Sequence, residues 1–227
     1  MAKFLNAFGL KLTEDVLGAP MPLLERNVRL AIIEFCEFTL TWRHELDAMD
    51  LVAGTNEYEL TVPDFTRLVT VAYAGDDDLR IVPTTMMTLD TTQEAWRKTG
   101  TSNRASQAQW YYLPDRTKIR LYLTPFEAKT EGLKVIVVLK PTQDAKSVED
   151  FLYEDHLEAI RHGTLARVLA IPAKEWSNAQ MAAWHKAEFE KLKKKEKAER
   201  LNDYTRESTF SVLPYNYAGS RRREEDC

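Results

Sequence analysis

The sequence predicts an α+β fold in which a helical bundle body is interrupted by an inserted antiparallel β-sandwich or barrel and followed by an extended C-terminal tail. Apolar residues recur every three or four positions near the N-terminus and again after residue 147, whereas they alternate in between. The final segment follows neither period. The expected divisions are therefore 1–56 and 143–201 for the two helical parts of the body, 57–142 for the β-rich insert and 202–227 for the tail.

The first helix is predicted over 22–43. Val28, Ile32 and Phe35 share one helical face, and Pro20 precedes them as a typical helix entrance. Because an apolar helical stripe must be covered by other parts of the fold, this face is expected in the core.

Two further helices are predicted after the insert. Ser147 with Asp150 resembles a capping box that opens a helix over 148–170, and Gly163 in its middle indicates a close helix crossing. Ser177 with Gln180 resembles a second capping box, which opens a helix over 177–200. These two helices complete the predicted bundle.

The insert is predicted from alternating and β-branched runs. Strands are expected near 58–62, 68–74, 110–113 and 118–124, and at 133–139, where nearly every residue is apolar. A short helix over 89–98 interrupts them, with Trp96 as its expected anchor. Gly75 and the three aspartates from Asp76 to Asp78 are expected to form a solvated hairpin turn, because a calcium site needs spaced carboxylates.

Composition excludes several classes of protein. With 227 residues and 44% hydrophobic content the chain can bury a core, while a net charge of −4 gives no overall attraction for nucleic acid or anionic lipid. Cys36 and Cys227 make no disulfide framework. No apolar run is long enough for a membrane span, and the first residues lack a signal-peptide core. We expect a soluble intracellular product with no membrane contact.

No catalytic or cofactor motif is recognisable. All glycines are isolated, which excludes a dinucleotide fingerprint and a phosphate-binding loop. His156 and His162 are six residues apart, too far around a helix to bind one zinc ion together. We therefore predict a protein that is not an enzyme and holds no cofactor or metal. The alternative of a metal-assisted hydrolase would use Asp155, His156, Glu158 and His162.

A lysine-rich run closes the last predicted helix, and its end is expected to project from the core. Interleaved glutamates favour an exposed helix with ion pairs between neighbouring turns. A nucleic-acid-binding module that uses the helix from Lys191 to Arg200 is the alternative function. The possible contacts with a DNA channel or a partner are Lys193, Lys194, Lys195, Lys197 and Arg200.

The tail carries more large apolar side chains than a purely solvated segment needs. Such side chains serve as anchors when a segment orders on a partner, and packing back onto the same chain is the alternative. The candidate docking residues are Tyr204, Phe210, Val212, Leu213, Tyr215, Tyr217, Arg221, Arg222 and Arg223.

Taken in order, these features resemble a known family. The motif from Ile33 to Cys36, Trp42, Trp96, the strand from Tyr122 to Pro125 and the helix over 151–171 make the chain similar to head-to-tail adaptor (connector) proteins of tailed bacteriophages. The similarity spans nearly the full length.

The resemblance implies a structural protein of the virion neck, made in the host cytoplasm. In that family, rings of twelve copies lie beneath the portal, and their helices surround the DNA channel. The β insert faces outward, and the C-terminal segment extends into the portal. The implied partners are the portal protein, a downstream tail or nozzle protein, further copies of the chain, and packaged double-stranded DNA in transient contact.

Overall fold

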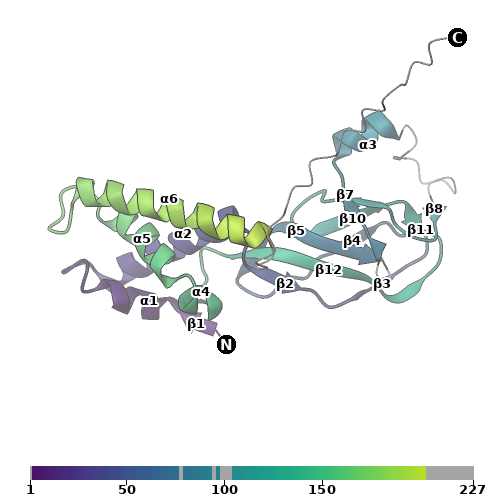
Figure 1. The fold of residues 1–227 in the computed structure, drawn as a ribbon. Helices are drawn as coiled ribbons and strands as arrows, with labels where there is room; N and C mark the ends of the chain where they lie inside the picture. The colour runs from purple at the N-terminus through teal and green to yellow at the C-terminus, as the bar shows by residue number, and fades with distance from the viewer. Residues whose placement is uncertain (1, 77–78, 94–95, 98–103, 203–227) are drawn as a thin grey trace, which may run out of the picture.

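The computed structural model describes residues 2–76, 79–93, 96–97 and 104–202. Figure 1 shows an elongated molecule with a helical body at one end and a β-rich region at the other. The fold is α+β, as predicted. One continuous hydrophobic core runs from the helices into the sheets. Among the described residues, no helix is both long enough and apolar enough to cross a membrane.

Helix α2 (Met21–Thr39) is the centre of the body. Its buried face includes Leu24, Val28, Ile32 and Phe35, as the helical spacing predicts. The predicted end at residue 43 is wrong, because Leu40 adopts a left-handed conformation (φ 58°) and its N–H bonds to the carbonyl of Cys36. This cap lets the chain turn into strand β2 (Arg43–Glu45).

The N-terminus adds elements that were not expected. Strand β1 (Ala2–Phe4) leads directly into helix α1 (Leu5–Leu12), which packs on α2. Strand β1 pairs antiparallel with β13 (Ser147–Glu149). The predicted capping box at Ser147 is therefore wrong, since these residues extend into a strand. The expected single helix is instead α4 (Phe151–Glu154) followed by α5 (Leu157–Val168).

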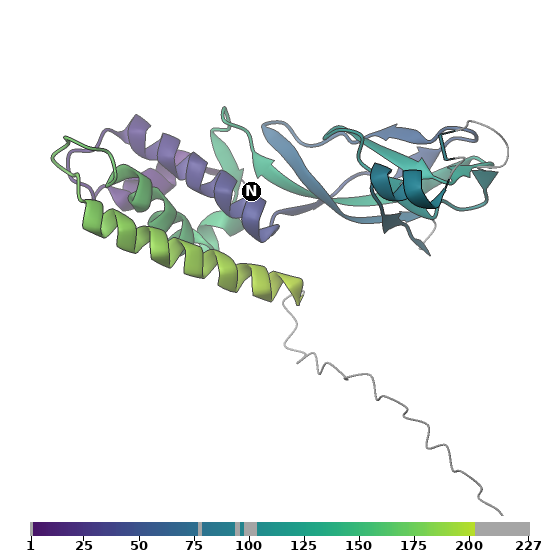
Figure 2. The ribbon, with the colours of Figure 1, turned by 90° about the horizontal axis from the view of Figure 1, so that it is seen from above.

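Helix α6 (Ala179–Leu201) closes the body. It begins one residue later than a cap at Ser177 would give, because Asn178 accepts the N–H of Met181 at 3.0 Å. Both views show α6 beside α5 and α2 (Figures 1 and 2). Gly163 confirms the predicted close crossing, since a Cβ there would lie 2.9 Å from the Phe189 ring and 3.1 Å from the Ala31 Cβ.

The β region is built around two long antiparallel strands, β5 (Thr66–Asp76) and β12 (Lys129–Pro141). They are the centre of a five-stranded sheet whose other members are β2, β3 (Met49–Leu51) and β6 (Leu79–Arg80). A four-stranded sheet has the order β4 (Glu57–Glu59), β10 (Lys118–Tyr122), β9 (Trp110–Tyr112) and β7 (Val82–Pro83). A two-stranded sheet joins β11 (Thr124–Pro125) to β8 (Arg104–Ala105). The β7–β9 and β11–β8 pairs are parallel, so the insert is not antiparallel throughout.

A small second core lies on the side of the β region that carries helix α3 (Met86–Thr92; Figure 1). It contains Leu89, Trp96, Tyr112 and Tyr122. Trp96 is buried there as expected, and its Nε1 donates to Asp90 at 2.7 Å, although it lies beyond the end of α3.

Asp76 contradicts the prediction of a fully solvated aspartate turn. It ends β5 and is completely buried, accepting the N–H of Ala108 at 3.0 Å and the ammonium of Lys129 at 2.9 Å. A buried carboxylate is stable only with such partners. Asp76 therefore ties β5 to β12 and to the loop before β9, and Asp77 and Asp78 lie outside the described residues.

Candidate interaction surfaces

A cluster of charges joins the three main helices of the body. Glu34 on α2 accepts from Lys193 on α6, with 2.5 Å between Oε1 and Nζ, and forms an ion pair with Arg167 on α5. Lys193 also pairs with Glu190 at 2.7 Å. Burial acts to raise the pKa of Glu34, but the hydrogen bond from Lys193 and the charges of Arg167 and Lys193 together hold it below its usual value.

Lys193 is only 3% exposed, and aromatic rings enclose its ammonium. The Nζ lies 5.0 Å from the ring centroid of Phe38 and 4.6 Å from that of Phe189. Such cation–π contacts compensate in part for the water that the charge has lost. Lys193 therefore positions α6 against α2 and is not presented at the surface of the described chain.

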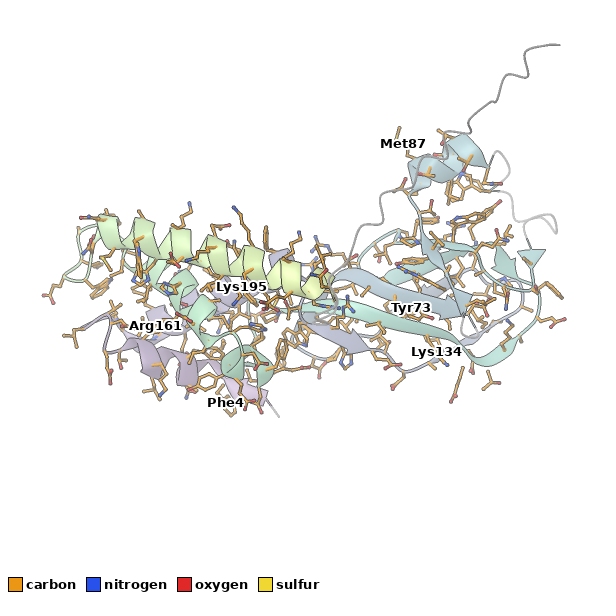
Figure 3. All side chains as sticks on the ribbon, viewed as in Figure 1. Phe4, Tyr73, Met87, Lys134, Arg161 and Lys195 are labelled. Atoms are coloured by element: carbon orange, nitrogen blue, oxygen red, sulfur yellow. The ribbon has the colours of Figure 1, made fainter. Side chains whose placement is uncertain are left out.

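The other basic candidates on α6 differ in their exposure. Lys194 and Lys195 are exposed, and Figure 3 labels Lys195 on this helix. Lys197 is half-buried with its Nζ 4.7 Å from the Phe38 ring, and Arg200 is buried. The prediction that this end projects from the core is thus wrong, because α6 packs against α2 through two of its basic residues.

A charged cleft of about 760 Å³ lies where the body meets the β region. Arg43, His156, Glu196 and Arg200 are among its lining residues. The Nδ1 of His156 lies 3.7 Å from Glu196, and burial, which outweighs the nearby carboxylates, lowers the pKa of His156. The end of α6 is therefore fixed at the junction between the two regions.

The residues of the hydrolase alternative do not meet in one place. His156 faces Glu196, whereas the Nδ1 of His162 lies 2.8 Å from the Nδ1 of His185 on α6. Asp155 and Glu158 are exposed, as expected for a solvated helix face. In the part of the chain that the structure describes, no group of three or more histidine, cysteine, aspartate or glutamate side chains is arranged to bind a metal ion.

The histidine pair lies in a groove at the far end of the body, called here the end groove. Its volume is about 760 Å³. Leu17, Met181 and Trp184 give it exposed apolar surface, with Trp184 half exposed and its ring 5.4 Å from that of His162. The acidic lining residues are Glu14, Asp15, Glu158 and Glu175.

The end groove was not identified from the sequence. The helix over 177–200 was predicted, but Trp184 within it was not singled out. A large aromatic residue beside a buried helical face was the available signal. Burial lowers the pKa of both His162 and His185.

The candidate docking residues from Tyr204 to Arg223 all lie outside the described residues, as does the rest of 203–227. The described chain ends at Asn202, directly after α6. The position from which this segment leaves the body is therefore set by α6 and its contacts with α2 and α5.

Comparison with known proteins identifies the family. A search of curated proteins found no match to the sequence. A family model, described as the SU10 adaptor protein, matches residues 3–212, which include both helical parts, the β region and the first part of the C-terminal segment. This range confirms the resemblance to phage head-to-tail adaptors: the chain belongs to the SU10 adaptor protein family.

Proposed function

We propose that this chain is a structural virion neck protein, an adaptor that joins the portal at the capsid vertex to the tail. The family match over 3–212 is the observation that carries this proposal. In the proposed assembly, a ring of about twelve copies lines the DNA channel through the helical body, and the sandwich-like insert faces outward. A downstream tail or nozzle protein would bind the opposite side of the ring.

We further propose that the segment 203–227 docks to the portal. Its tyrosines and its three consecutive arginines are suited to a partner groove with apolar pockets and acidic edges. The firm attachment of α6 supports this assignment, since Glu34 and Lys193 hold the helix from which the segment departs. A rigid origin limits the volume that the segment must search before it meets its site.

Electron microscopy of the full chain mixed with its cognate portal tests this function. We expect a ring beneath the portal with the wild type, and loss of that ring when the chain ends at Leu201. In the full chain, Tyr215→Ser combined with Tyr217→Ser should weaken assembly on the portal. The matched control Phe65→Ser changes an exposed aromatic residue of the β region and should assemble normally. A ring that survives in the chain that ends at Leu201 would contradict docking through this segment.

For the contact with packaged DNA, Lys194, Lys195 and Lys197 are the candidates that keep some exposure. Burial of Lys193 and Arg200 reduces the support for a dedicated nucleic-acid-binding module. A module of that kind would lose affinity steeply with salt, and Lys194→Gln with Lys195→Gln would lower the salt slope by about two. Lys174→Gln, at an exposed lysine outside α6, is the control. We expect only weak DNA binding by the free protein, and little change in any variant.

A further inference from the structure

The end groove has the properties of a docking site, and its occupant can be inferred from the chain itself. It combines an exposed tryptophan and neighbouring apolar side chains with four acidic residues. Of the basic residues that line it, Arg161 is engaged by Asp15, with 2.8 Å between Nε and Oδ2. The complementary ligand is therefore a peptide that carries large apolar side chains next to positive charge.

We infer that the segment 203–227 of the same chain occupies the end groove in the free protein. The segment contains such a sequence, with Phe210, Leu213 and Tyr215 followed by Arg221 to Arg223. Docking in the groove would cover these aromatic residues until a partner replaces the contact. The inference concerns the unassembled protein and does not depend on the portal contact proposed above.

The segment is long enough to reach the groove. Trp184 precedes Leu201 by 17 residues of continuous helix, which corresponds to about 26 Å at the rise of an α-helix. Phe210 follows Leu201 by nine residues, and an extended chain of that length spans up to about 30 Å. A segment that turns back along α6 therefore brings its first apolar residues to Trp184.

Along this path, the order of polar and apolar residues in the segment also matches the order of charged and apolar surface on the body. The exposed face of α6 between Leu201 and Trp184 is charged, with ion pairs between Lys195 and Glu199 and between Lys191 and Glu188. Residues 203–209 are mostly polar and would lie along that face. The apolar residues that follow would meet Trp184 and Met181.

The arginines would come last on this path. Glu14 and Glu175 line the end groove together with Ser177 and Asn178, the residues that directly precede α6, so both acidic residues lie near the N-terminal end of that helix. Arg221 to Arg223 follow the apolar stretch and would reach these acidic residues. Three successive zones of the segment therefore correspond to three zones of the body in the same order.

Chymotrypsin cleavage of the full chain tests this inference, with the sites between Phe210 and Tyr217 followed by mass spectrometry. Docking should slow cleavage in the wild type, and Trp184→Ala should accelerate it about fivefold or more by favouring the undocked state. Met87→Ala changes an exposed apolar residue of α3 and should have no effect. Equal cleavage rates in the wild type and Trp184→Ala would overturn the inference.

A second variant tests the charges without altering apolar packing. Glu14→Lys with Glu175→Lys should also accelerate cleavage, and the difference from the wild type should shrink at high salt. Glu127→Lys, at an exposed position of the β region, is the matched control. If charge reversal in the groove has no more effect than this control, the arginines do not bind there and the assignment fails.

Protein concentration distinguishes the same chain from a second copy. Intramolecular docking predicts a wild-type cleavage rate per molecule that is constant over a roughly hundredfold range of protein concentration at a fixed enzyme level. Protection that develops only at high concentration would assign the groove to another copy and overturn the intramolecular inference. Protection that requires added portal would likewise overturn it.

Discussion

The helical body and the β region differ in the interactions that align their neighbouring elements. In the β region, β5 and β12 are aligned by backbone pairing that runs from Leu133 opposite Asp76 to Pro141 opposite Thr66. The backbone groups of a helix bond within that helix, so the alignment of the helices in the body depends on side chains. The ion pairs of Glu34 and the contact at Gly163 set how α2, α5 and α6 meet. The orientation of α6 therefore depends on a few individual residues.

The largest effect should come from breaking the helix crossing. Gly163→Leu adds four carbon atoms at a place where one Cβ would already lie 2.9 Å from Phe189. We expect a loss of about 4 kcal/mol or more in the free energy of unfolding, or failure to fold, because the core cannot accommodate the added volume. Chemical denaturation monitored by circular dichroism measures it. A loss below 1 kcal/mol, roughly that of an ordinary surface substitution, would show that the helices can separate freely here.

The second-largest loss of stability is expected in the β region, from a substitution that tests whether backbone pairing alone holds its strands together. Asp76→Ala removes a buried carboxylate and leaves the ammonium of Lys129 and the N–H of Ala108 without this acceptor. We expect a loss of about 3 kcal/mol in the free energy of unfolding. Hydrogen exchange at Ala108 and along β5 should rise. A variant as stable as the wild type would mean that the strands need no charged side chain.

Removing the acid at the centre of the body should have a smaller effect. Glu34→Ala takes one carboxylate from Lys193, which keeps Glu190 and the two rings. Since Glu34 is partly exposed, we expect a cost of about 2 kcal/mol by denaturation. Glu57→Gln, which breaks the exposed pair with Lys118 in the β region, is the control and should cost much less, because water screens an exposed ion pair. Equal effects of the two changes would remove the special role assigned to Glu34.

The smallest effect should be a dependence of the stability of the helical body on pH. Burial lowers the pKa values of His162 and His185 in the folded protein. In the unfolded chain, histidine has its ordinary pKa near 6.5. Below that pH the unfolded chain therefore binds more protons than the folded chain. Stability present above that pH should therefore be lost as the pH falls. The charged residues whose fields act on the pair are Asp15, Glu158, Arg161 and Glu188.

Thermal unfolding between about pH 7.5 and 5 measures this dependence. One histidine can donate to the other while the pair is neutral, but two protonated rings would repel each other. His185→Gln should flatten the dependence of the melting temperature on pH, since glutamine does not titrate. A steeper decline in His185→Gln would contradict the assignment.

Local sequence patterns predicted much of the fold. The stripe of Val28, Ile32 and Phe35 identified α2, and the isolated glycine at Gly163 indicated the crossing. Both signals are local, since each depends on spacing within one helix. The apolar run at 133–139 likewise identified the central strand β12.

Contacts between residues distant in the sequence were not predicted. Strand β1 pairs with β13 across most of the chain, and this pairing turned the expected cap at Ser147 into a strand. Lys193 was expected in solvent because glutamates interleave with the lysines of this run, a pattern typical of an exposed helix. Its partner is Glu34, whose position among apolar residues of α2 was the signal that could have revealed the pair. The end groove depends on three separate segments and could not be assembled from local patterns.

The attachment of α6 also determines how the protein would carry mechanical load. Both views place α6 side by side with α5 and α2 (Figures 1 and 2). A pull on Leu201 along the helix axis would therefore shear Lys193 against Glu34 and slide the Phe189 ring past Gly163, loading these contacts together rather than one after another. Tension applied through the C-terminal segment would therefore pass first into the helical body.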